Sequence, residues 1–311
     1  MQLHRPLENV HLSPWQADVT LLLITAIWGW TFLVVKDVIS VYPVFSFLSL
    51  RFALALLVLL PFVWPRVRTL SWVQARAGLL TGLFLFAGYS LQTVGLKYTS
   101  IPKSGFITGL YVVLVPILAT VFLRRVPSRS AAIGLFLATV GLIRLSLGPD
   151  LSIGVGDLLT LIGAVAYAAH VTAVSRFGRD TDPMTYSALQ IATVFVGTLV
   201  LASLWDGPSA WENASVNVLQ AAFLTGIVAT ALVLVLQATA QRFTSPTRTA
   251  VMFTMEPVFA AVFGIAFAGE RLAASGWLGA GLILVGMLMA EVGDAVFRRR
   301  PALSTNVLSA D

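Results

Sequence analysis

The sequence contains no cysteine and only three histidines among its 311 residues. Without cysteine the chain cannot form disulfides, thiolate metal sites or thiol redox couples, and three histidines do not favour a zinc site. The phosphate-binding pattern G-x-x-x-x-G-K-[ST] does not occur, so direct use of ATP is not expected. We therefore expect no metal and no cofactor.

Charged residues are also scarce. They make up 11% of the chain, against 58% hydrophobic residues, and the mean hydropathy is +0.88. Apolar runs of about 20 residues recur, and a helix of that length crosses a hydrocarbon core of about 30 Å. This composition excludes an ordinary soluble domain and predicts an all-α protein that spans the membrane many times.

The apolar windows, bounded by charge or proline, predict ten transmembrane helices. A cytoplasmic N-terminal segment, 1–17, precedes them, and a basic, disordered C-terminal tail, 294–311, follows them. The predicted spans are 18–37, 44–64, 75–96, 104–123, 129–147, 157–177, 183–204, 216–238, 249–269 and 274–293.

The basic residues set the predicted orientation. The net charge is +6, but Lys and Arg lie mostly in short loops between apolar runs, which favours a topology signal over nucleic-acid binding. With the N-terminus inside, the cytoplasmic loops and tails hold fourteen of the twenty Lys and Arg residues. The positive-inside rule therefore predicts that both termini are cytoplasmic. We expect a multi-pass protein of the cell membrane.

An internal repeat relates the two halves of the chain. Leu91-Gln92 recurs 145 residues later as Leu236-Gln237. Further polar and glycine matches are Thr99-Ser100 with Thr244-Ser245, Gly134 with Gly279, and Gly141 with Gly286. The predicted repeats, 18–147 and 157–293, each hold five helices. Because five is odd, the second repeat must have inverted topology, which is a common plan of transporters with a midplane site between the halves.

One charge interrupts the ninth predicted span. Glu256 is followed directly by Pro257, which removes a backbone donor and bends or opens a helix. An ionisable group inside a span is costly and indicates a functional site, although a static salt bridge or a protonated carboxyl would serve structure alone. Pro116 aligns with Pro257 only if a four-residue gap is allowed, whereas the ungapped repeat pairs Val112 with Pro257. We predict helix breaks at both prolines; if the gap is wrong, the two halves break their helices one turn apart.

At this point the sequence resembles the EamA-type transporters of the drug/metabolite transporter superfamily, which contain two five-helix EamA repeats. The resemblance covers residues 18–293 and rests on four features: Trp28-Gly29-Trp30-Thr31-Phe32, Arg51, Lys103-Ser104-Gly105-Phe106, and Glu256-Pro257 with Gly269-Glu270-Arg271. It implies export of amino acids, other metabolites or drugs by alternating access.

Depth along the helices selects further candidates. Arg51 and Glu256 are separated by roughly 6 Å along the membrane normal, so a buried ion pair is possible, although depth does not fix the facing direction. His170 lies nearly level with Glu256 and is a candidate for proton relay, or else a neutral side chain packed between helices. Tyr111 is the repeat mate of Glu256, so two walls of one cavity would carry a phenol and a carboxylate.

Aromatic and amide side chains complete the predicted site. Trp28, Trp30, Tyr89 and Tyr167 lie near mid-depth and would line an amphipathic cavity. Gln92 and Gln237 are repeat mates that we assign to gating or to tying loops.

The predicted function is that of a secondary transporter which exports small amphipathic metabolites such as amino acids. Its partners are the substrate, the lipid bilayer and, if transport is coupled, protons, and the chain is a monomer or a homodimer. The alternatives are an uncoupled facilitator or exchanger and a membrane-embedded lipid-modifying enzyme. The enzyme is disfavoured because the spans offer too few acid–base groups. A channel would need rings of like charge or a filter loop, and the sequence shows neither.

Overall fold

The computed structural model describes residues 12–123, 128–146, 153–177, 181–207, 214–240, 243 and 252–297. Within these ranges the chain is helical and contains no strand, in agreement with the predicted all-α class. Most of the predicted terminal segments, 1–17 and 294–311, lies outside the described residues.

The first half contains six helical segments among the described residues. They are α1 (Pro14–Val41), α2 (Val44–Val67), α3 (Trp72–Lys97), α4 (Ile101–Gly109), α5 (Tyr111–Leu123) and α6 (Arg129–Ser146). Local sequence explains several starts. Ser13 and Ser71 each form a capping box with a glutamine three residues later, and Ser100 caps α4. A serine at this position accepts a bond from a backbone N–H that would otherwise be unpaired.

The second half begins with α7 (Val155–Phe177) and α8 (Pro183–Leu201), which continues as the π-helical η2 (Ala202–Asp206). A long helix then changes from α10 (Val216–Phe223) through the π-helical η3 (Leu224–Leu232) to α11 (Val233–Ala240). The last two helices are α13 (Glu256–Phe267) and α14 (Ala274–Phe297). π-Helical turns are rare and often occur at functional sites.

Six helices of the described chain are each long and apolar enough to cross a membrane, namely Pro14–Val41, Val44–Val67, Trp72–Lys97, Val155–Val174, Pro183–Asp206 and Val216–Gln237. Shorter apolar helices cover Ile101–Val115, Glu256–Ala268 and Ala274–Ala290. The predicted total of ten spans and the cytoplasmic position of both termini remain predictions.

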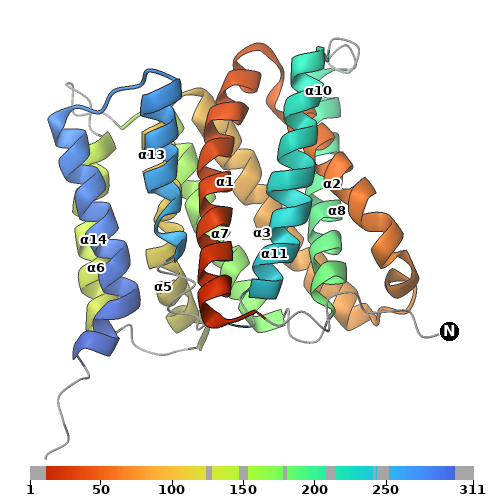
Figure 1. Cartoon of the computed structure of the whole chain (residues 1–311), viewed down its shortest axis with the longest axis horizontal. Coiled ribbons are helices and arrows are strands. Elements are labelled where there is room, and N and C mark those ends of the chain that lie inside the picture. The colour runs from red at the N-terminus through yellow and green to blue at the C-terminus, as the bar shows by residue number, and fades with distance from the viewer. Residues whose placement is uncertain are drawn as a thin grey trace, which may run out of the picture.

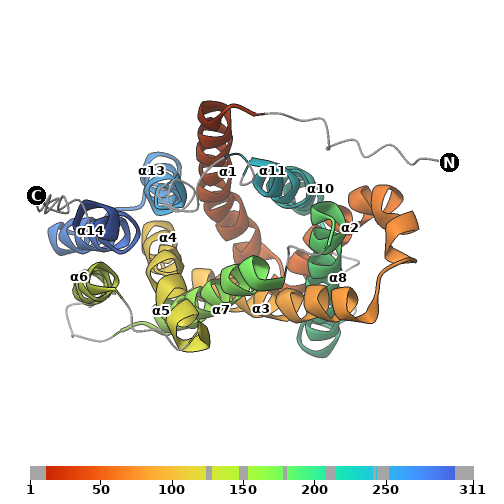
Figure 2. The same ribbon diagram turned by 90° about the horizontal axis from the view of Figure 1, so that it is seen from below.

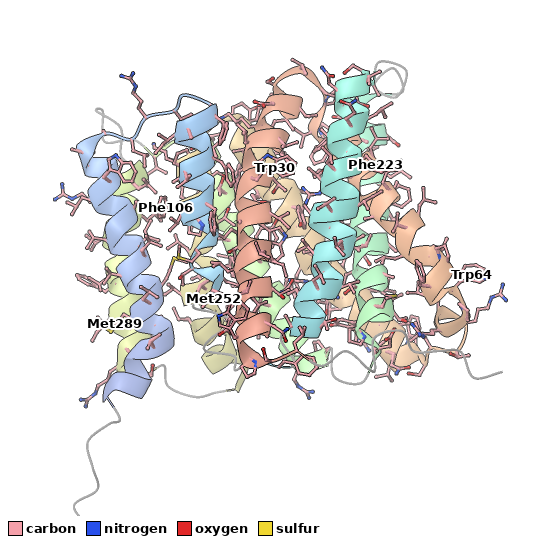
Figure 3. The ribbon with its side chains drawn as sticks, viewed as in Figure 1. Trp30, Trp64, Phe106, Phe223, Met252 and Met289 are labelled. Atoms are coloured by element: carbon pink, nitrogen blue, oxygen red, sulfur yellow. The ribbon has the colours of Figure 1, made fainter. Side chains whose placement is uncertain are left out.

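The helices stand side by side with their long axes roughly aligned, as Figure 1 shows, and α6 and α14 form a pair at one end of the bundle (Figure 2). Large apolar side chains on the outer surface are exposed, as lipid contact requires; Trp64 at the edge of the bundle is 48% exposed (Figure 3).

Glycines explain how closely α6 and α14 pack. A Cβ on Gly134 would lie 2.5 Å from the carbonyl oxygen of Gly286, and one on Gly141 would lie 2.6 Å from that of Gly279. Glycine therefore permits backbone contact that any side chain would block. Each glycine meets the repeat mate of the other, as expected where a two-fold axis relates two inverted halves. These four glycines thus serve packing between α6 and α14 within one chain.

Candidate functional site

A cavity of about 110 Å³ lies among α1, α2, α3, α4, α5, α7, α11 and α13. One water molecule needs about 10–15 Å³ by this measure, so the cavity has room for several waters or one small organic molecule. Its wall includes most of the predicted site residues, namely Trp28, Arg51, Tyr89, Gln92, Tyr111, Tyr167, His170, Gln237 and Glu256. Trp30, which lies on α1 (Figure 3), is not among the lining residues.

Two interrupted helices present the cavity's phenol and carboxylate. Helix α4 ends at Gly109 and α5 begins at Tyr111, while α13 begins at Glu256 after a turn at Thr254 and Met255. At each break one backbone N–H reaches back only three residues: Leu110 N donates to Ile107 O (3.2 Å) and Met255 N donates to Met252 O (3.0 Å). These bonds are 145 residues apart, so the two halves break at equivalent positions.

Proline explains only one of these breaks. Pro257 lies in the first turn of α13, as predicted, where its missing N–H has no helical partner to lose. Pro116 instead lies inside α5, six residues after the break at Leu110. The first half therefore breaks where the ungapped repeat places the break, without a proline.

The two breaks bring the predicted mates Tyr111 and Glu256 together. The Tyr111 hydroxyl donates to Glu256 Oε2 across 3.5 Å, a long hydrogen bond. Both residues are buried: Glu256 is 7% exposed and Tyr111 also 7%. A carboxylate thus faces the cavity with a phenol beside it.

Arg51 enters the cavity from α2 and is 3% exposed. Its Nε donates to Thr230 Oγ1 (3.0 Å), and its guanidinium carbon lies 5.0 Å from the centre of the Tyr89 ring. Gly226 allows η3 to approach this point, since a Cβ there would lie 2.5 Å from Arg51 O. No ion pair between Arg51 and Glu256 is found in the described residues, so the possible buried pair is not formed in this structure.

Aromatic rings form the apolar part of the wall. Tyr89 and Tyr167 meet edge to face with centroids 5.6 Å apart, and Tyr111 lies 6.4 Å from Tyr167. Trp28 lies 5.6 Å from Phe253, and its Nε1 donates to Ala229 O (3.3 Å). Such rings offer stacking surface to an apolar group and a negative face to a cation.

The two glutamines also line the cavity. Gln92 is held on both sides: its Nε2 donates to Thr108 Oγ1 and its Oε1 accepts from the Tyr167 hydroxyl, both at 2.9 Å. Gln237 lines the cavity as well, so both repeat mates lie at the site.

His170 is bonded to Gln190 with 2.6 Å between Nε2 and Oε1. Gln190 Nε2 donates to Tyr186 O, so its Oε1 faces the imidazole as an acceptor. Nε2 of His170 therefore carries a hydrogen, and a neutral ring leaves Nδ1 as an acceptor. This arrangement supports the packed, hydrogen-bonded interpretation of His170.

The described residues contain no group of three His, Cys, Asp or Glu side chains that could hold a metal ion.

Comparison with known proteins shows which family the chain belongs to. Residues 15–147 and 154–291 each match the EamA-like transporter family. The chain belongs to the EamA-like transporter family. It is a membrane transporter and a multi-pass protein of the plasma membrane.

Several relatives support this membership. An "Uncharacterized transporter" of Archaeoglobus fulgidus is 32% identical over 276 residues, which are 89% of this chain and 86% of the relative. The "Uncharacterized inner membrane transporter YedA" of Escherichia coli K12 is 25% identical over 290 residues, 91% and 93% of the two chains. A solved crystal structure shares the fold, with a TM-score of 0.63 and 17% identity over 90% of this chain and 99% of its own.

Sequence reasoning missed three polar residues that hold side chains of the cavity wall, of which only Thr108 itself lines the cavity. Thr230 fixes Arg51, Gln190 fixes His170, and Thr108 fixes Gln92. Each is a polar residue inside an apolar run, which is the signal that would have marked it. Their partners could not be assigned without knowing which helices face each other.

Proposed function

We propose that this EamA-like transporter exports small amphipathic metabolites, amino acids or their relatives first, by alternating access around the cavity. The observation that supports this most is a pair of opposite charges in one buried cavity that do not neutralise each other. Arg51 is bound to Thr230 and stacked near Tyr89, and Glu256 is bound to Tyr111.

The cavity chemistry matches a zwitterion. A buried guanidinium is stabilised by an anion. Of the Arg51 nitrogens only Nε has a hydrogen-bond partner among the described residues, so we assign the two terminal nitrogens to a substrate carboxylate. Glu256 and the aromatic faces would receive an ammonium group, and the rings would cover the apolar body. A ligand carrying both charges satisfies groups that are costly to leave buried and unpaired.

Proton coupling would use Glu256. A carboxylate beside a phenol in a cavity can exchange a proton and release an ammonium when protonated. His170 is held by Gln190 through one nitrogen and would act as a hydrogen-bond acceptor toward the cavity. If Glu256 only anchors Tyr111, the protein is an uncoupled facilitator or exchanger.

Ligand protection against heating tests this proposal. A ligand that binds only the folded state raises stability by about 2.7 kcal/mol at one hundred times its dissociation constant. We expect a subset of zwitterionic metabolites to raise the melting temperature of wild type in detergent, and Arg51→Ala to lose the effect. Stabilisation by lipid headgroups alone, with no response to soluble metabolites, would favour the enzyme and contradict the proposal.

A further inference from the structure

The turn between α3 and α4, residues 98–100, is held from three sides at the end of the bundle that the charge distribution predicts to be outer. The first hold comes from α1. Lys36 Nζ donates to Leu96 O (3.0 Å) and to Thr99 O. An ammonium that binds two backbone carbonyls ties α1 to the end of α3, where those carbonyls lack helical partners.

The second hold comes from α7. Asp157, which is 3% exposed, accepts from the Thr99 hydroxyl, and its Oδ2 lies 3.5 Å from Lys103 Nζ. Close backbone packing supports this contact: a Cβ on Gly156 would lie 2.7 Å from the carbonyl carbon of Tyr98. The start of α7 is therefore pressed against the turn.

The third hold comes from the segment between α13 and α14. Glu270 Oε2 accepts from Ile101 N across 2.7 Å, so its carboxyl caps the first turn of α4. Gly269, with φ of +66°, follows the end of α13 just before Glu270, a conformation that glycine adopts without strain. We call Lys36, Thr99, Lys103, Asp157 and Glu270 the turn clasp.

The turn clasp adjoins one end of the cavity. Leu96, whose carbonyl accepts from Lys36, lines the cavity, and so does Val35 next to Lys36. The clasp also joins the two halves of the chain, since Asp157 and Glu270 belong to the second repeat and the turn belongs to the first. If substrate leaves the cavity past this end, these contacts must separate.

We propose that the turn clasp is the outer gate of the cavity, and that Asp157 and Glu270 are the residues which hold it closed. This inference rests on the proposed transport function, because a gate has a purpose only if substrate passes. Rocking of the two inverted halves would draw α7 and the α13–α14 segment away from the turn. The bonds of Thr99, Ile101 and Lys103 would then be lost together.

A cysteine accessibility experiment tests the gate, and the absence of natural cysteine gives it a clean background. Thr93, which lines the cavity and is 3% exposed, is replaced by cysteine in the full chain. Intact cells are treated with a membrane-impermeant maleimide. We expect Asp157→Ala and Glu270→Ala each to speed labelling about 10-fold, the effect of losing one hydrogen bond to a charged group.

Two control variants accompany the test. Asp37→Asn removes an exposed carboxylate close to Lys36 on α1 and should leave labelling at the parent rate. Glu270→Gln keeps an oxygen that can accept from Ile101 N but loses the charge, so its labelling rate should lie between those of the parent and Glu270→Ala. Equal labelling of Asp157→Ala, Glu270→Ala and Asp37→Asn in folded protein would overturn the gate.

If Asp157→Ala fails to fold, Lys103→Met removes the same ion pair from its more exposed side, and the same labelling rates decide the outcome. The labelling needs no substrate, so it separates this inference from the proposed function. Faster labelling without any transported metabolite would support the gate and count against the substrate class. Metabolite transport with unchanged labelling would support the substrate class and contradict the gate.

Discussion

Replacing Arg51 by lysine changes the cavity while keeping its positive charge. Lysine cannot present the planar fork of a guanidinium, so it loses the two parallel bonds to a carboxylate, the Nε bond to Thr230 (3.0 Å) and the stacking near Tyr89 (5.0 Å). The change therefore tests whether substrate is recognised by geometry or by charge alone.

The expected loss follows from one bond of the bidentate pair. A hydrogen bond to a charged group contributes about 1.5–3 kcal/mol, and about 1.4 kcal/mol corresponds to a tenfold change in affinity. Because lysine retains one charge-assisted bond, we expect Arg51→Lys to bind the best protecting amino acid about 10- to 100-fold more weakly.

Isothermal titration of the purified protein in detergent measures this affinity. Arg144→Lys is the matched control, since Arg144 is an exposed arginine near the end of α6 and lies outside the cavity wall. We expect the control to bind like wild type. If Arg51→Lys also binds within about twofold of wild type, a difference below about 0.5 kcal/mol, the guanidinium does not hold the substrate and the assignment of Arg51 is refuted.

Two further predictions concern stability. Gly141→Ala places a methyl group 2.6 Å from Gly279 O and should lower the free energy of unfolding by about 1–3 kcal/mol. Gly281→Ala is the control, because a Cβ there meets nothing within 4 Å, and its stability should stay that of wild type. Thermal melting compares the two variants. Burial raises the pKa of Glu270 above its ordinary 4.5, against the lowering effects of the Ile101 N–H and the Lys36 charge. The folded state then holds this proton more tightly, so wild type should gain melting temperature over Glu270→Gln as pH falls toward 4.5, and a gap independent of pH would contradict this.

Sequence reasoning reached the helical class and the repeat because both depend on local patterns. Apolar length predicts helices, and the shared offset of 145 predicts that Tyr111 and Glu256 are equivalent, which the two helix breaks and their hydrogen bond support. The offset also relates Gly134 to Gly279, and the structure adds that such mates cross over between α6 and α14.

The remaining features depend on which faces of the helices meet. Depth brought Arg51 and Glu256 within reach of each other, but the side chain of Arg51 turns toward Thr230 and Tyr89. The break before Tyr111 has no proline beside it, so the sequence does not mark it. The prediction of a break at Pro116 was wrong, because this proline lies inside α5. The turn clasp joins Asp157 and Glu270 to one turn, and the chain between these two carboxylates is too long for spacing to reveal it.

Counterflow in proteoliposomes tests the central claim most directly. Radiolabelled amino acids, aromatic and small, are exchanged by wild type and by Glu256→Gln at two pH values, with and without a pH gradient. We predict that the variant exchanges substrate but no longer accumulates it when a pH gradient is imposed, because the carboxyl that carries the proton is gone. If wild type and variant exchange and accumulate alike under every gradient, Glu256 has only a structural role and proton-coupled export through this carboxylate is contradicted.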